Sequence, residues 1–171
     1  MKKRVFATLI AATAMIGTNV HAAETTPFNA EDIYVGGGLS SNSASGLDSA
    51  MGFQIFAGVP LNVDLGSVNS AVEVGYMDSG KMEACVNVPF FGNVCGGDNA
   101  TGIWANYVAT MPLSGQLYGV GRLGLDFGDD DGLMYGIGVG HGIDDKLDVR
   151  GEYVARDNIN SLQLNVVYRL R

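Results

Sequence analysis

Apolar and polar residues alternate with a period of two along most of this 171-residue chain, and this alternation limits the folds open to it. Such a period is the pattern of a β-strand with two unlike faces, and no segment beyond residue 22 has the period of an amphipathic helix. Eight strands are predicted, over residues 32–40, 50–60, 71–78, 101–111, 117–128, 133–143, 147–156 and 159–170. The chain is therefore expected to be all-β.

Turn-forming residues separate the eight predicted strands and connect each strand to the next. The connections 144–146 and 157–158 have the two- or three-residue length of compact hairpins. Residues 62–69 and 112–116 are predicted as longer turns, and residues 79–99 form the longest connection. No linker divides the chain, so we expect one antiparallel, up-and-down sheet that closes into an eight-stranded barrel.

Residues 1–22 have the composition of a secretory signal peptide. The segment opens with three basic residues, and residues 5–17 are apolar but too few to span a bilayer. Cleavage is expected after Ala22, with Ala23 as the alternative, which leaves residues 23–171 as the barrel. An N-terminal helix belonging to the fold is the competing interpretation.

The composition of residues 23–171 excludes several classes of protein. Three of the 10 basic residues lie in the predicted signal peptide. Residues 23–171 therefore contain 7 Lys and Arg and 18 Asp and Glu, which gives a net charge of −11 (7 − 18). Nucleic acid is therefore not an expected partner, because phosphate contacts need clustered basic residues. At 47% hydrophobic residues the chain is not disordered, and no apolar run reaches the 18 residues of a membrane-spanning helix.

The charged residues of the predicted strands all fall on one face, and the question is whether that face lies inside. A soluble barrel turns its apolar face inward, whereas a membrane barrel turns it outward. The charged face carries many glycines, which weaken a solvated strand but leave room in a narrow lumen for residues such as Phe56 and Tyr118. It is almost without lysine, and arginine suits paired interior charges. We therefore predict a transmembrane barrel, with a soluble lipocalin-like barrel as the alternative.

Charged residues on this inward face are expected to form a network. An unpaired charge in a nearly dry lumen costs several kcal/mol, so each is expected to find a partner and the network to plug the pore. A small-solute pore or a proton-conducting path remains an alternative. The predicted network consists of Glu73, Arg122, Asp126, Asp148, Arg150, Glu152 and Arg156.

The longest connection holds the two cysteines of the chain, Cys85 and Cys95. Export compartments favour disulfides, and closing this loop contributes about 2–3 kcal/mol in the chain-entropy model. Strand counting places the loop outside the cell. Between the cysteines the sequence is unusually apolar, and Phe90 and Phe91 are candidates for contact with the outer leaflet or with a partner. A loop folded on itself over Phe90 is the alternative.

Neither a metal site nor a cofactor is predicted. The acidic loop 129–131 lacks the spacing of an EF-hand, since Phe127 and Gly138 occupy the first and twelfth positions. A solvated turn is expected there, with a loose divalent-cation contact to lipopolysaccharide phosphates as the alternative.

No catalytic residues are predicted, because a hydrolase needs a nucleophile beside a base. His141 is the one histidine beyond the signal peptide. A His-x-Ser pair that starts at His141 would need a serine nucleophile at position 143, where this chain has Ile143. The spacing of Ser161 and Asp148 does not support a triad with His141. A lipid A-modifying enzyme is therefore kept only as a minor alternative.

These features together resemble the small eight-stranded outer-membrane barrels of Gram-negative bacteria, the OmpA-transmembrane-domain and OmpX-like group. The resemblance rests on the signal peptide, the eight segments, Asp-Ile-Tyr-Val-Gly-Gly-Gly at 32–38 and Leu-Asn-Val-Val-Tyr-Arg-Leu-Arg at 164–171. It implies a closed antiparallel up-and-down transmembrane β-barrel with periplasmic termini, in contact with outer-membrane lipid and lipopolysaccharide. It further implies insertion by the barrel assembly machinery, a monomer, and a non-enzymatic role in outer-membrane integrity or surface interaction. The group's closing strand ends on an aromatic residue, whereas Arg171 ends this chain.

Overall fold

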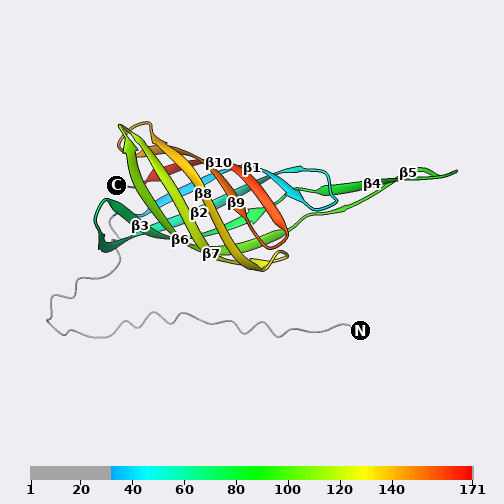
Figure 1. Cartoon of the computed structure of the whole chain (residues 1–171), viewed down its shortest axis with the longest axis horizontal. Helices are drawn as coiled ribbons and strands as arrows, with labels where there is room; N and C mark the ends of the chain where they lie inside the picture. Colours follow the sequence, from blue (N-terminus) through cyan, green and yellow to red (C-terminus); the bar gives the residue numbers. More distant parts are fainter. Residues whose placement is uncertain (1–31, 171) are drawn as a thin grey trace.

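The computed structural model describes residues 32–170, which form ten strands and no long helix (Figure 1). Eight strands form a closed antiparallel barrel in the order β1-β10-β9-β8-β7-β6-β3-β2, and β4 pairs with β5 outside it. The strands are β1 (Tyr34–Ala44), β2 (Ala50–Leu65), β3 (Val68–Asp78), β4 (Met82–Val88), β5 (Gly92–Asp98), β6 (Thr101–Ser114), β7 (Leu117–Gly128), β8 (Gly132–Gly142), β9 (Leu147–Ala155) and β10 (Ile159–Arg169). Among the described residues, no helix is long and apolar enough to cross a bilayer.

The eight barrel strands coincide with the eight predicted segments, so the predicted fold class is confirmed. The barrel ends differ from the prediction, because β2 and β3 continue through most of the expected turn 62–69. A register shift between Leu61 and Leu65 absorbs the polar residues there, and Gly66 closes the turn with a φ of 70°. The amide of Gly66 also donates a hydrogen bond to Asp64 Oδ1 at 3.1 Å. Strand pairing at a solvated rim thus tolerates residues that, in sequence, indicate a turn.

The connection 79–99 is a two-stranded ribbon rather than a loop. We call it the hairpin; it consists of β4, β5 and the turn between them, and it extends beyond the barrel along the barrel's long axis (Figure 1). One backbone hydrogen bond, from Asp48 N to Glu83 O at 2.7 Å, joins the hairpin to the loop between β1 and β2. A second, from Ser79 N to Ala100 O at 2.8 Å, joins the two segments that connect the hairpin to β3 and β6.

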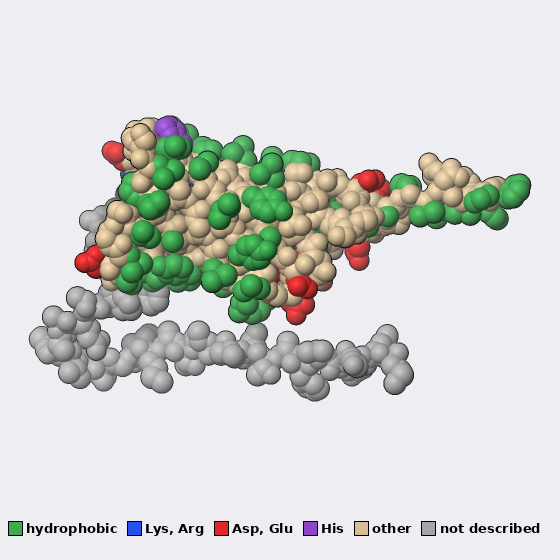
Figure 2. All heavy atoms as spheres, viewed as in Figure 1, with side chains coloured by type: hydrophobic (Ala, Val, Ile, Leu, Met, Phe, Trp, Pro, Cys, Tyr) green, Lys and Arg blue, Asp and Glu red, His purple; other side chains and the backbone are tan. Residues whose placement is uncertain are grey.

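The apolar strand face points outward and the charged face points inward, as the membrane barrel requires. Leu123 and Ile137 are 55% and 73% exposed, whereas Glu73 and Trp104 are fully buried. Interior glycines make room for large neighbours: a Cβ on Gly36 would lie 2.3 Å from the Phe56 ring. On the face shown in Figure 2, apolar side chains cover the barrel wall while acidic ones lie at the barrel ends and the hairpin base.

Outward aromatic residues are found near both ends of the barrel. We call the end that holds residues 32 and 170 the terminal end, and the opposite end the hairpin end. Phe53 and Tyr76 pack together near the hairpin end, with their ring centroids 6.3 Å apart. Tyr168 lies at the terminal end, near the last residue of β10. The predicted signal peptide lies outside the described residues and stays a prediction.

Candidate functional site

The lumen holds a buried group of paired charges at mid-height. Arg122 reaches Glu152 with Nη2 2.5 Å from Oε2, and the same Nη2 lies 3.4 Å from Glu73 Oε2. Arg150 Nη1 lies 2.6 Å from Glu73 Oε1. We call these four residues the central cluster. Two arginines face two glutamates, so the cluster is neutral if all four are ionised.

Polar neighbours donate further hydrogen bonds to the two glutamates of the central cluster. Tyr34 donates a hydrogen bond to Glu73 at 2.8 Å, and Asn165 donates one to Glu152 at 3.2 Å. Gln54 donates to Asn165 at 2.8 Å and so extends the network toward β2. The guanidinium of Arg122 also lies over the Trp104 ring, 5.6 Å from its centroid, in a cation–π arrangement.

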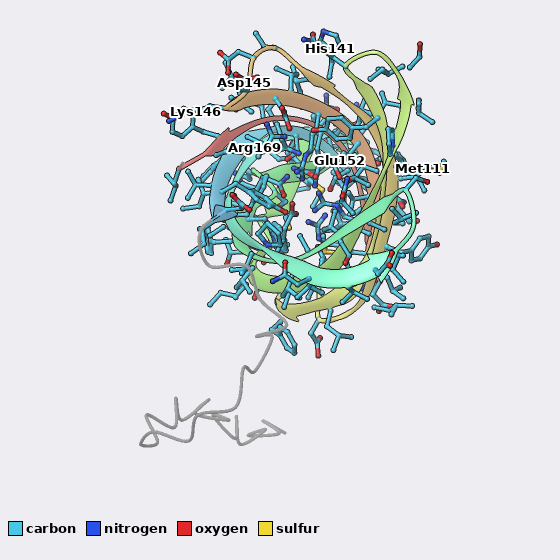
Figure 3. The ribbon with its side chains drawn as sticks, turned by 90° about the vertical axis from the view of Figure 1, so that its left-hand side faces the viewer. Met111, His141, Asp145, Lys146, Glu152 and Arg169 are labelled. Carbon is cyan, nitrogen blue, oxygen red and sulfur yellow. A yellow bond between two sulfur atoms is a disulfide. The ribbon has the colours of Figure 1, made fainter. Side chains whose placement is uncertain are left out.

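Toward the terminal end the network continues to the solvent. Arg150 Nε donates to the hydroxyl of Tyr118 at 3.3 Å, and this hydroxyl donates to Asp148 at 2.9 Å. Arg169 Nη2 lies 2.6 Å from the same carboxylate. A cavity of about 300 Å³, lined in part by Tyr34, Asp148, Arg150 and Arg169, opens there. Figure 3 looks into this end and shows Glu152 within the barrel.

A second group of paired charges lies toward the hairpin end. Arg156 Nε lies 2.8 Å from Asp126 Oδ2, and Arg156 Nη1 donates to Ser161 at 2.9 Å. Ser161 in turn donates to Asn42 Oδ1 at 2.6 Å. We call Asp126, Arg156, Ser161 and Asn42 the outer cluster. The fully buried Val154 of β9 lies in the sequence between Glu152 of the central cluster and Arg156 of the outer cluster. Buried apolar side chains, among them Trp104 and Met134, therefore share the lumen with the ionic groups.

The structure places all seven predicted lumen residues in the interior, each with an ion pair. Asp148 is linked to the central cluster through Tyr118, whereas Arg156 and Asp126 form a separate group toward the hairpin end, so the seven residues form two groups rather than one network. The neutral partners were not predicted from the sequence, although their position in the alternation puts them on the charged face. These partners are Tyr34, Asn42, Gln54, Ser161 and Asn165.

A disulfide joins Cys85 of β4 to Cys95 of β5, as predicted. At the hairpin tip Phe90 is fully exposed and Phe91 is 83% exposed. The alternative of a loop folded over Phe90 is therefore wrong, because paired strands hold the tip away from the barrel. Contact of these two rings with the outer leaflet or a partner stays a prediction.

The acidic loop after β7 is a structured turn. Asp129 accepts hydrogen bonds from the amide and hydroxyl of Thr101, at 2.9 and 3.1 Å. Asp130 accepts from the amides of Asn158 and Ile159. Within residues 32–170, no group of three or more His, Cys, Asp or Glu residues is placed to hold a metal ion.

The residues considered for catalysis lie apart. His141 is exposed on the outside of the terminal end (Figure 3), whereas Ser161 lies in the lumen within the outer cluster. Asp148 is engaged with Tyr118 and Arg169. The described residues therefore do not bring these three groups together as a triad.

Comparisons with known proteins agree with this architecture. A designed transmembrane β-barrel superposes with a TM-score of 0.54 at 13% identity, covering 85% of this chain and 100% of the design. The outer membrane protein Ail of Yersinia pestis, in a phospholipid nanodisc, gives 0.54 at 13% identity, covering 82% and 99%. The crystal structure of Ail, the attachment invasion locus protein of that organism, gives 0.51 at 12% identity, covering 81% and 97%.

Sequence comparison gives the family. None of the curated proteins matches the chain. The family described as outer membrane protein beta-barrel domain matches residues 8–169, which is nearly the whole chain. This chain therefore belongs to the outer membrane protein beta-barrel domain family.

Proposed function

We propose that the protein is a non-enzymatic, monomeric outer-membrane barrel that makes surface contacts through its hairpin. The observation that carries the proposal is the exposed pair Phe90 and Phe91 at the end of a disulfide-linked ribbon. Exposed apolar side chains gathered at one projecting point are typical of an interaction site. The name of one structural neighbour, the attachment invasion locus protein, agrees with a role in attachment.

In this proposal the barrel sits in outer-membrane lipid and lipopolysaccharide after insertion by the barrel assembly machinery. The termini lie in the periplasm and the hairpin lies outside the cell. The up-and-down topology supports this orientation, because it gathers both described ends at one side and the hairpin at the other.

The proposal is tested by attachment of bacteria to cultured cells. Bacteria carrying the wild-type protein are compared with bacteria carrying Phe90→Ser/Phe91→Ser, and with a matched variant, Asn87→Ser/Asn93→Ser. We expect the first variant to lose attachment and the second to keep it. Equal attachment by all three would overturn the contact role. Detergent sensitivity that appears only when the whole protein is deleted would then favour a role in membrane integrity.

We further propose that the lumen is closed to solutes. The fully buried ion pairs of the central cluster and the apolar side chains beside it support this. The cavity at the terminal end is the one observation that favours a small-solute pore instead. Planar-bilayer recordings decide between them: a closed lumen gives no porin-like current, and a steady current from the wild type would establish the pore.

A further inference from the structure

The tip of the hairpin holds its two aromatic rings outward. The amide of Phe91 donates to the carbonyl of Val88 at 3.0 Å and closes the turn. Phe90 has a φ of 72°, in the left-handed region that a bulky residue seldom occupies. The turn therefore directs both rings into the solvent, although it stores local backbone strain to do so.

One face of the hairpin continues this apolar tip. Val86 lies opposite Val94 in the ribbon, and both are more than half exposed. The other face carries the disulfide and a side-chain hydrogen bond of 3.0 Å between Asn87 and Asn93. The ribbon is thus amphipathic, with an apolar face that leads to the phenylalanine pair.

The charges around the hairpin lie at its base. Residues 84–97 contain no Asp, Glu, Lys or Arg, whereas Glu83 and Asp98 mark the two ends of this uncharged segment. Lys81 pairs with Glu83 at 2.6 Å, so it offers little free positive charge to a partner. The other acidic residues of the hairpin-end loops are Asp48, Asp129, Asp130, Asp131 and Asp157. An anionic surface would be repelled by this base, whereas a surface without net charge would not.

The hairpin points away from the bilayer that holds the barrel. Its strands of seven residues reach about 23 Å from the base, at about 3.3 Å per residue. They run along the barrel axis and away from the apolar wall (Figures 1 and 2). The tip therefore meets whatever lies opposite the cell surface.

We propose that the tip, Pro89–Phe91, inserts into the interface of an apposed bilayer of zwitterionic phospholipid. This inference rests on the proposed contact function and names the partner. Two neighbouring phenylalanines on a convex, uncharged tip are suited to insertion into a lipid interface. Transfer of their rings out of water is favourable by itself and does not require a partner with matching polar groups. A protein that added a strand to the hairpin would instead pair with its backbone edges and would not require the two rings at the tip.

Vesicle flotation tests the inference directly. The protein in a nanodisc is mixed with phosphatidylcholine vesicles, and empty nanodiscs measure the background. We expect the wild type to float with the vesicles and Phe90→Ser/Phe91→Ser to bind at least about tenfold more weakly, given the transfer free energy of two phenylalanines. Asn87→Ser/Asn93→Ser should bind like the wild type, and adding phosphatidylserine to the vesicles at low salt should weaken binding. Heat-modifiable gel mobility confirms that each variant is folded.

A tryptophan at the tip provides a second readout. The native Trp104 is fully buried, so its emission is a constant background. We expect the emission of Phe91→Trp to shift to the blue when phosphatidylcholine vesicles are added. No shift, no flotation of the wild type, or equal loss in the asparagine variant would each overturn the lipid partner. If vesicle binding fails while Phe90→Ser/Phe91→Ser still abolishes cell attachment, the contact function stands and its partner is a protein.

Discussion

Among single residues, Arg122 has the largest predicted effect on stability, because it serves both glutamates of the central cluster. Arg122→Ala leaves two buried carboxylates with one arginine, so we expect the free energy of unfolding to fall by about 3–5 kcal/mol in denaturant titrations. Arg122→Met combined with Glu152→Gln should lose less, because no buried charge is then left unpaired. A single variant as stable as the double variant would contradict this account. Neither variant should produce large currents if the apolar side chains also close the lumen.

The role of interior glycines in lumen packing can also be tested by substitution. Gly36→Ala places a Cβ against the Phe56 ring, and we expect a loss of about 1–3 kcal/mol in the free energy of unfolding. Gly121→Ala is the matched control, because its Cβ would point into open space. Adding Phe56→Leu should recover part of the loss caused by Gly36→Ala. Equal effects of the two alanines would show that strand propensity, rather than lumen packing, determines the cost.

Whether a strand residue points into the lumen or outward could be predicted from the sequence, but its interaction partner could not. Alternation assigns each strand residue to the lumen or the wall, and this sufficed for all seven charged positions. Pairing depends on register and tilt across several strands, which the sequence pattern leaves open. Arg122 on β7 thus meets Glu152 on β9, two strands away, while Tyr34 on β1 meets Glu73 on β3.

Among the elements, the hairpin is nearly independent of the barrel, to which its base is held by few contacts. In Cys85→Ser/Cys95→Ser we therefore expect the barrel to keep its unfolding midpoint. The loss of about 2–3 kcal/mol in loop-closure free energy should appear as faster local opening of the hairpin. Amide hydrogen exchange over residues 84–97 measures that opening. A matching fall in the barrel's midpoint would mean that hairpin and barrel unfold together.

The barrel strands were predictable as elements because their alternation runs over eight or more residues. The hairpin was not, because β4 has only seven residues and β5 contains Gly92, Gly96 and Gly97. Side chains of β5 are exposed on both faces, so no burial pattern distinguishes it from a loop. The disulfide was predictable because it depends on cysteine number and compartment rather than on strand pairing.

For the whole molecule, the distribution of lysines makes orientation measurable. Beyond the predicted signal peptide the chain has two lysines, Lys81 at the hairpin base and Lys146 in the turn before β9. An amine reagent that cannot cross the membrane should label Lys81 on intact cells and Lys146 only after permeabilisation. Lys81→Arg and Lys146→Arg assign the two labels by mass spectrometry. Labelling of Lys146 alone on intact cells would reverse the proposed orientation.

The same reaction gives a pH prediction at the cell surface. The hydrogen bond from Lys81 to Glu83, together with the charge of that carboxylate, raises the pKa of the Lys81 amine above its usual value. Only the deprotonated amine reacts, so at a fixed pH below that pKa the raised value slows labelling. Glu83→Gln should return the pKa toward its ordinary value, and labelling of Lys81 should then be faster at the same pH, with Lys146 as the internal control in permeabilised cells. The difference should shrink as the pH rises past both pKa values, because the amine is then deprotonated in either protein. A rate unchanged by Glu83→Gln throughout that range would mean that the ion pair does not persist on the hydrated surface, where such pairs contribute little.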